Sequence, residues 1–156
     1  MNILVIDGQG GKLGRKLIES IRKVCPEAEI TAVGTNSTAS INMMRSECAD
    51  HIATGENAVI VGCRKAELIV GPFGIAMADS MFGEISPAMA NAVASSQAHR
   101  VLIPMNLCDT YVAGVAQGSQ AIIEDAMKYI SRLTGKPAEE KSEAQNGGRN
   151  DETANV

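Results

Sequence analysis

The first fourteen residues constrain the fold most, because an aliphatic run leads directly into a glycine-rich segment. Ile3–Ile6 is a continuous run of four aliphatic residues, and it stops at Asp7. Such a run is typical of a strand that is buried on both faces of a parallel sheet. Four glycines then follow within Gly8–Gly14. The segment therefore predicts a buried strand that ends in an open, glycine-rich loop.

An amphipathic helix and a second strand follow this loop. The apolar residues of the helix recur at helical spacing, and Pro26 marks its end. Glu29–Val33 reads as a second strand closed by Gly34. The apolar positions of the helix are Leu13, Leu17, Ile21 and Val24. Residues 1–34 thus predict one strand–helix–strand unit.

Alternation of strands and helices continues along the chain. Ser37 is the predicted N-cap of a helix that runs to about Cys48, and Ser86-Pro87 is a good helix start. No assignment is made for residues 75–85. The remaining predicted elements are strands at 51–53, 67–70, 100–103 and 111–115, and helices within 55–66 and at about 122–133.

This alternation predicts an α/β fold, a Rossmann-like three-layer sandwich with a mainly parallel sheet of five or six strands. Its 156 residues suit one domain, expected at residues 1–135. Residues 136–156 have almost no apolar bulk and are expected to form a disordered tail. In such sheets, ligands bind beyond the carboxyl ends of the strands.

Composition limits the partners of the chain. The formal net charge is −4 and aromatic residues make up only 3% of the chain. Both values argue against a nucleic-acid surface, which needs clustered cations or stacking aromatics. No membrane span, signal peptide or CxxC pair is found, so a cytoplasmic protein with reduced thiols and no membrane partner is expected.

The glycine-rich loop favours an anionic ligand. Missing side chains let backbone amides approach a phosphate, and the dipole of the following helix adds to the attraction. A strict GxGxxG spacing fails because Leu13 takes the third glycine position, and no Walker A spacing occurs. The alternative is that the glycines only make a tight turn and let the helix pack on the strand.

The segment Gly8–Ile18 resembles the cofactor loop of dihydrodipicolinate reductases, a GxGG[KR][ML]GRxLI pattern. This resemblance implies a pyridine nucleotide whose pyrophosphate lies over Gly11, Lys12 and Leu13. It does not extend to the reaction of that family, because His51 and His99 are isolated and do not form the paired catalytic histidines.

The end of the second strand favours NADP(H) over NAD(H). Dinucleotide sites usually carry an acid there to hold the ribose hydroxyls, but Thr35, Asn36 and Ser37 are neutral. Their hydroxyl and amide donors suit a 2′-phosphate, with Arg15 or Arg45 as the cation. The carboxylate of Asp7 would repel a bare pyrophosphate and suits ribose hydroxyls or a hydrated Mg²⁺ instead.

The loops after later strands complete the expected nucleotide site. Gly71–Gly74 and Asn106 would line its reactive end. In the first loop, which begins at Gly8, the phosphate would lie on Gly10, Gly11 and the start of the helix near Lys12. Cys108 is a candidate nucleophile, although a lone cysteine is more often a small buried hydrophobe. No complete acid–base or nucleophile set is found. A non-enzymatic sensor, or a structural protein whose glycine loop binds nothing, therefore stays an alternative to an enzyme.

A homodimer is the expected assembly, because Met77, Met81 and Phe82 form an apolar group in the unassigned stretch.

Over about residues 1–115 the chain resembles an uncharacterised family of short bacterial proteins, defined as a domain of unknown function, and the tail lies outside this resemblance. The resemblance supplies no activity, but its segments lie at the ends of predicted strands and indicate one shared surface. These segments are Asp7–Gly11, Ala32–Ser37, Ala53–Val59, Gly71-Pro72 and Ile103-Pro104.

Overall fold

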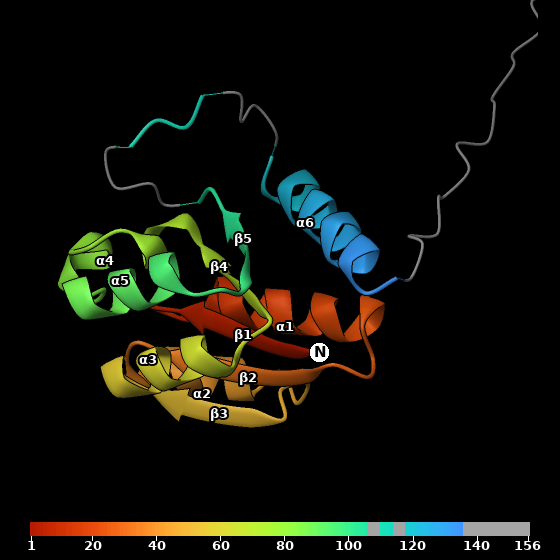
Figure 1. Cartoon of the computed structure of the whole chain (residues 1–156), viewed down its shortest axis with the longest axis horizontal. Coiled ribbons are helices and arrows are strands. Elements are labelled where there is room, and N and C mark those ends of the chain that lie inside the picture. The colour runs from red at the N-terminus through yellow and green to blue at the C-terminus, as the bar shows by residue number, and fades with distance from the viewer. Residues whose placement is uncertain (106–109, 114–117, 136–156) are drawn as a thin grey trace, which may run out of the picture.

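The structure is a computed structural model that describes residues 1–105, 110–113 and 118–135. A five-stranded parallel sheet with the order β3-β2-β1-β4-β5 lies at its centre (Figure 1). The strands are β1 (Asn2–Asp7), β2 (Glu29–Gly34), β3 (His51–Thr54), β4 (Leu68–Pro72) and β5 (His99–Ile103). The helices are α1 (Lys12–Val24), α2 (Ser37–Met44), α3 (Glu56–Lys65), α4 (Ser80–Gly83), α5 (Pro87–Ser95) and α6 (Ser119–Leu133), with a short 3-10 helix, η1 (Phe73–Ala76).

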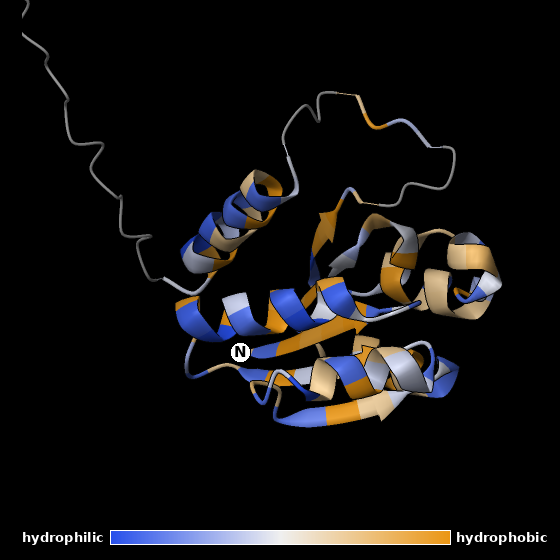
Figure 2. Cartoon of the chain, turned by 180° about the vertical axis from the view of Figure 1, so that it is seen from behind, coloured by the Kyte–Doolittle hydropathy of each residue, from blue (hydrophilic) through white to orange (hydrophobic). Residues whose placement is uncertain are grey.

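The central strand shows why the aliphatic run is continuous. Ile3 and Val5 pack among the side chains of α1 and α6, whereas Leu4 and Ile6 pack among those of α3 and α5. All four are at most 1% exposed. Figure 2 shows the matching pattern, with apolar colour along β1 and mixed colours along α1 and α6. The predicted α/β sandwich with helices on both faces is thus confirmed, with five strands.

Most predicted elements are present, but three details differ. The N-cap of α2 is Asn36, whose Oδ1 accepts a hydrogen bond from the Ala39 amide at 2.9 Å, so the prediction of Ser37 was off by one residue. The helix also ends at Met44, before Cys48. Residues 111–113 form no strand, and positions 114–115 of that prediction lie outside the described residues.

The segment left unassigned at 75–85 contains a left-handed turn. Asp79, Met81 and Phe82 have φ values of 62°, 55° and 58°, and Gly83 follows with 85°. Left-handed backbone costs an L-residue roughly 1–2 kcal/mol, so surrounding contacts must maintain it. The side chain of Met81 is buried in the core, and the Asp79 amide donates to the Ile85 carbonyl at 2.7 Å, which closes the turn.

The arginine Arg22 fastens the far end of α1 to the loops before β2 and β3. Its guanidinium donates to the carbonyl oxygens of Pro26 and Ala28 at 2.8 Å each, and to that of Cys48 at 2.8 and 3.1 Å. It also pairs with Asp50 at 2.8 Å. Arg22 therefore ties three segments together with one side chain.

The sheet order places a topological switch point between β1 and β4. From β1 the chain moves outward to β2 and β3, and then crosses to the other side of β1 to form β4 and β5. Ligands of open α/β sheets bind at such a point, beyond the carboxyl ends of the strands. None of the helices that the structure describes is long and apolar enough to cross a membrane.

Candidate functional site

The loop after β1 is built around the buried carboxylate of Asp7. Its Oδ1 accepts a hydrogen bond from the Gly8 amide at 2.8 Å, and its Oδ2 accepts one from the Gly14 amide at 2.7 Å. Burial raises the pKa of Asp7 above its ordinary value, although the two amides act in the opposite direction. The two oxygens of Asp7 therefore join the two ends of the loop and fix its conformation.

A second carboxylate, that of Glu84, reaches the loop from the residue that directly follows α4. Its Oε2 accepts hydrogen bonds from the Gln9 amide at 2.8 Å, from Asn36 Nδ2 at 2.9 Å and from the Thr35 hydroxyl. Burial acts to raise the pKa of Glu84, but these three hydrogen bonds outweigh it and bring the pKa below its ordinary value. Glu84 thus lies at the end of β2, where the sequence shows only neutral residues.

Three backbone amides of the loop stay open for a ligand. Among the described residues, the amides of Gly10, Lys12 and Leu13 have no hydrogen-bond acceptor. Asn36 Nδ2 donates to the Gln9 carbonyl at 3.1 Å. The Gly10 amide belongs to the same planar trans peptide, so it faces the opposite way. The N-cap residue of α1, Gly11, has no side chain and the first turn contains no acid; Asp7 binds the Gly14 amide, so the amides of Lys12 and Leu13 are the ones left for an anion.

Three of the four loop glycines have a structural explanation. A Cβ on Gly8 would lie 2.8 Å from the Met81 sulfur, one on Gly11 would lie 2.5 Å from the Ala39 carbonyl oxygen, and one on Gly14 would lie 2.5 Å from the Met43 sulfur. Gly11 also has a left-handed φ of 65°. A Cβ on Gly10 would meet nothing within 4 Å, and its φ does not require glycine. Only Gly10 leaves space that the protein itself does not use.

A pocket of about 310 Å³ opens beside this loop. It lies at the β1–β4 switch point, because Pro72 at the end of β4 and Met81 form its other wall. The loop residues that line it are Asp7, Gly8, Gln9, Gly10, Gly11, Lys12 and Leu13. The pocket combines open amides, a helix N-terminus and an apolar wall.

The remaining predicted site residues lie in several places. Thr35 and Asn36 contact Glu84, and every hydrogen-bonding group of the Asn36 side chain is used. Ser37 is exposed at the start of α2, whereas Gly71 is buried where a Cβ would collide with the Ile6 carbonyl. Asn106 lies outside the described residues, as does the candidate nucleophile Cys108.

The three apolar residues expected at a dimer surface, Met77, Met81 and Phe82, do not lie together on the surface. Met81 is only 5% exposed and belongs to the core, so its assignment to an outer surface was wrong. Phe82 is 98% exposed, and Met77 is half-buried.

Glu84 and Met81 were missed as parts of the site by sequence reasoning. Both approach Gly8 from a turn in which Met81 and Phe82 have left-handed backbone. The only local signal for that turn was Gly83, because methionine and phenylalanine have no preference for left-handed backbone. The contact also joins residues that are far apart in the sequence, so no spacing rule could reveal it.

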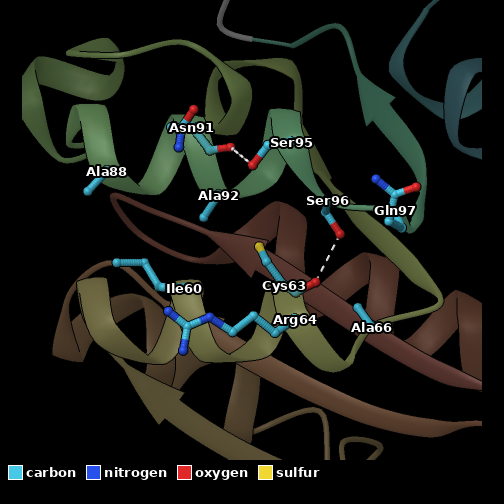
Figure 3. Close-up of a pocket in the computed structure, with 10 residues that line it drawn as sticks. All are labelled: Ile60, Cys63, Arg64, Ala66, Ala88, Asn91, Ala92, Ser95, Ser96 and Gln97. Carbon is cyan, nitrogen blue, oxygen red and sulfur yellow. Dashed lines mark hydrogen bonds between the residues drawn. The ribbon is translucent and has the colours of Figure 1, made fainter.

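A second pocket lies between α3 and α5, away from the glycine loop (Figure 3). Small side chains such as Ala88, Ala92 and Ser95 form much of its wall. Its one thiol, Cys63, has a pKa raised to about 11 by burial, and the hydroxyl of Ser96 donates to the Cys63 carbonyl at 2.9 Å. A protonated thiol is a poor nucleophile, so this pocket is a weaker candidate than the glycine loop.

The hydrogen bonds of Glu84 predict a pH dependence of stability. Its pKa is lower in the folded chain than the ordinary value of 4.5. Its contribution to stability is therefore complete above about pH 4.5 and is lost as the pH falls through the folded-state pKa. We expect the difference in free energy of unfolding between the wild type and Glu84→Gln to shrink in acid, measured by urea denaturation between pH 7 and pH 3. The control is Asp79→Asn, which removes an exposed carboxylate from the same segment. Parallel curves for wild type and Glu84→Gln would contradict the prediction.

Comparisons with known proteins identify a family but no activity. No curated protein matches the chain. One matching solved structure is a dodecameric FMN-dependent Ubix-like decarboxylase from Escherichia coli O157:H7, with 16% identity over 88% of this chain and 96% of that chain, and a TM-score of 0.48. The family model described as "Domain of unknown function (DUF3842)" matches residues 2–135. This match covers all the described elements from β1 to α6, and the chain belongs to that family.

Proposed function

We propose that the protein binds a phosphorylated nucleotide, with a phosphate group on the open amides of Gly10, Lys12 and Leu13. The single observation that carries this proposal is Gly10. Its missing side chain serves neither packing nor backbone conformation, yet it borders a pocket at the switch point of the sheet. Space that is empty beside unpaired amides suits an oxyanion.

The charges around the loop define where the phosphate would lie. Asp7 is covered by the loop and is bonded on both oxygens, and Glu84 lies on the β2 side of the loop. Lys12 is exposed at the start of α1 and lines the pocket, whereas the ammonium of Lys16 donates to Gln120 of α6 at 2.7 Å. A phosphate at the start of α1 would therefore meet amides, the helix dipole and the lysine Lys12.

The size of the pocket favours a mononucleotide-sized group within it. Its volume of about 310 Å³ is near the lower end of ligand pockets, which typically measure about 300–1,000 Å³. NADP(H), the cofactor favoured by the sequence, would fit only in part and would extend along the surface toward β2. The Met81 and Pro72 wall would face the organic part of the ligand.

A binding experiment on the full chain tests this function. We expect calorimetric titration to detect binding of at least one among AMP, ADP, FMN, NAD(H) and NADP(H). We also expect Gly10→Val to weaken that binding about tenfold or more, which corresponds to about 1.4 kcal/mol. Gly10→Val should leave the melting temperature of the free protein unchanged, because its side chain enters open space.

The matched control is Gly118→Val at the N-cap of α6. That glycine also has nothing within 4 Å of a Cβ and lies outside the loop. It should leave binding unchanged, although valine is a poorer N-cap residue than glycine and should lower the stability slightly. The proposal fails if none of the nucleotides binds at millimolar concentration, or if both valine variants bind as the wild type does.

The exposed Phe82 supports a further part of the sequence prediction, a homodimer. Light scattering coupled to size exclusion should show a dimer that Phe82→Ser converts to a monomer. A wild-type monomer would remove this proposal.

A further inference from the structure

The residues at the end of β2 are neutral, but in the folded protein the carboxylate of Glu84 lies beside them. Thr35 and Asn36 would offer a hydroxyl and an amide to a 2′-phosphate, but both donate to Glu84 Oε2 instead. The site therefore presents a carboxylate where the sequence suggests phosphate-binding donors. This carboxylate comes from residue 84 and not from the second strand, which normally supplies the acid in dinucleotide sites.

The carboxylate has a fixed orientation with one free oxygen. The Gln9 amide, the Asn36 amide and the Thr35 hydroxyl all bind Oε2, and no hydrogen bond to Oε1 is found among the described residues. Glu84 is not among the residues that line the pocket, but its side chain is half-buried and lies beside Gly8, which does line it. The left-handed turn at Met81, Phe82 and Gly83 and the packing of Met81 against Gly8 hold the residue in place.

We infer that Glu84 makes the nucleotide site select a ribose with free hydroxyls and reject a 2′-phosphorylated one. This inference rests on the proposed function, because it concerns the sugar of a nucleotide whose phosphate lies on the Gly10 loop. A ribose hydroxyl would donate to the free Oε1 of Glu84, which forms a charge-assisted hydrogen bond. A 2′-phosphate would face a like charge and would find both neighbouring donors, Thr35 and Asn36, already occupied.

The test compares ligand pairs that differ only in the 2′-phosphate. Binding of NADH against NADPH, and of AMP against adenosine 2′,5′-bisphosphate, is measured by calorimetry with the full chain at low and moderate salt. We expect the wild type to bind the unphosphorylated member of a pair at least tenfold more tightly. We expect Glu84→Gln to reduce this ratio several-fold, because glutamine keeps an oxygen for the three donors but loses the charge. Asp79→Asn, on the same turn, should leave the ratio unchanged.

The outcomes separate this inference from the proposed function. If neither member of any pair binds, and FMN and ADP also fail, the nucleotide site itself is wrong. If the wild type binds both members equally, or prefers the 2′-phosphorylated one, only the role of Glu84 is wrong. This outcome is measured on the wild type alone and does not depend on the folding of a variant. A wild-type preference that persists unchanged in a folded Glu84→Gln protein also overturns that role.

Discussion

Replacing Gly11 with alanine should lower the free energy of unfolding by about 3 kcal/mol, because a left-handed residue and a backbone clash add their costs. The φ of Gly11 is 65°, and the new Cβ would lie 2.5 Å from the Ala39 carbonyl oxygen and 2.7 Å from the Ala39 Cα. Those atoms belong to the first turn of α2 and cannot move without shifting the helix. Urea denaturation monitored by circular dichroism would measure the effect.

The neighbouring Gly10→Ala is the matched control for this experiment. It makes the same chemical change one residue away, but in open space. We expect its stability to stay within about 0.5 kcal/mol of the wild type, as for surface substitutions in general. Equal losses in the two variants would show that the loop is not held against α2 as described.

Replacing Arg22 with alanine should also cost about 3 kcal/mol, because charge-assisted hydrogen bonds to three carbonyl groups are lost together. These carbonyls belong to Pro26, Ala28 and Cys48. Asp50 loses its ion pair in the same variant, although it keeps a hydrogen bond from the Ile30 amide at 2.7 Å. Thermal and urea unfolding would both report the loss.

Lysine at position 22 should recover less than half of this stability. A lysine keeps the charge, but it lacks the planar fork that reaches several acceptors at once. The control is Lys23→Ala, which changes the adjacent, exposed cation and should shift stability by no more than about 0.5 kcal/mol. If Arg22→Lys were as stable as the wild type, the charge and not the shape of the guanidinium would hold the loops.

The fold could be predicted where local patterns and burial agree. The run Ile3–Ile6 predicts a strand buried on both faces, and its side chains do alternate between the two cores. The Ser86-Pro87 pair predicts the start of α5 and does cap it. At α2, Asn36 and Ser37 are both good caps, and only the surrounding hydrogen bonds decide between them.

The candidate site could be predicted only in part, because several residues that contact the glycine loop come from distant parts of the sequence. The glycine spacing indicates the loop after β1, but it cannot show which glycines serve packing. Gly11 and Gly14 are explained by Ala39 and Met43, on a helix whose approach the sequence does not reveal. The presence of Glu84 beside Thr35 depends on a left-handed turn that local propensity opposes.

The central position of β1 in the sheet has a consequence for the order in which the domain folds during synthesis. β1 pairs with β2, which follows soon in the chain, and also with β4, which begins only at Leu68. The hydrogen bond from the Gln9 amide to Glu84 likewise joins residues that are far apart in the sequence. Contacts between distant residues form late, because the chain loses entropy when it closes a long loop. A growing polypeptide therefore cannot complete the surface around the glycine loop until β4 and Glu84 have been synthesised and have docked. Any small molecule that recognises this surface would act on the finished domain and would favour it over its partly assembled precursors.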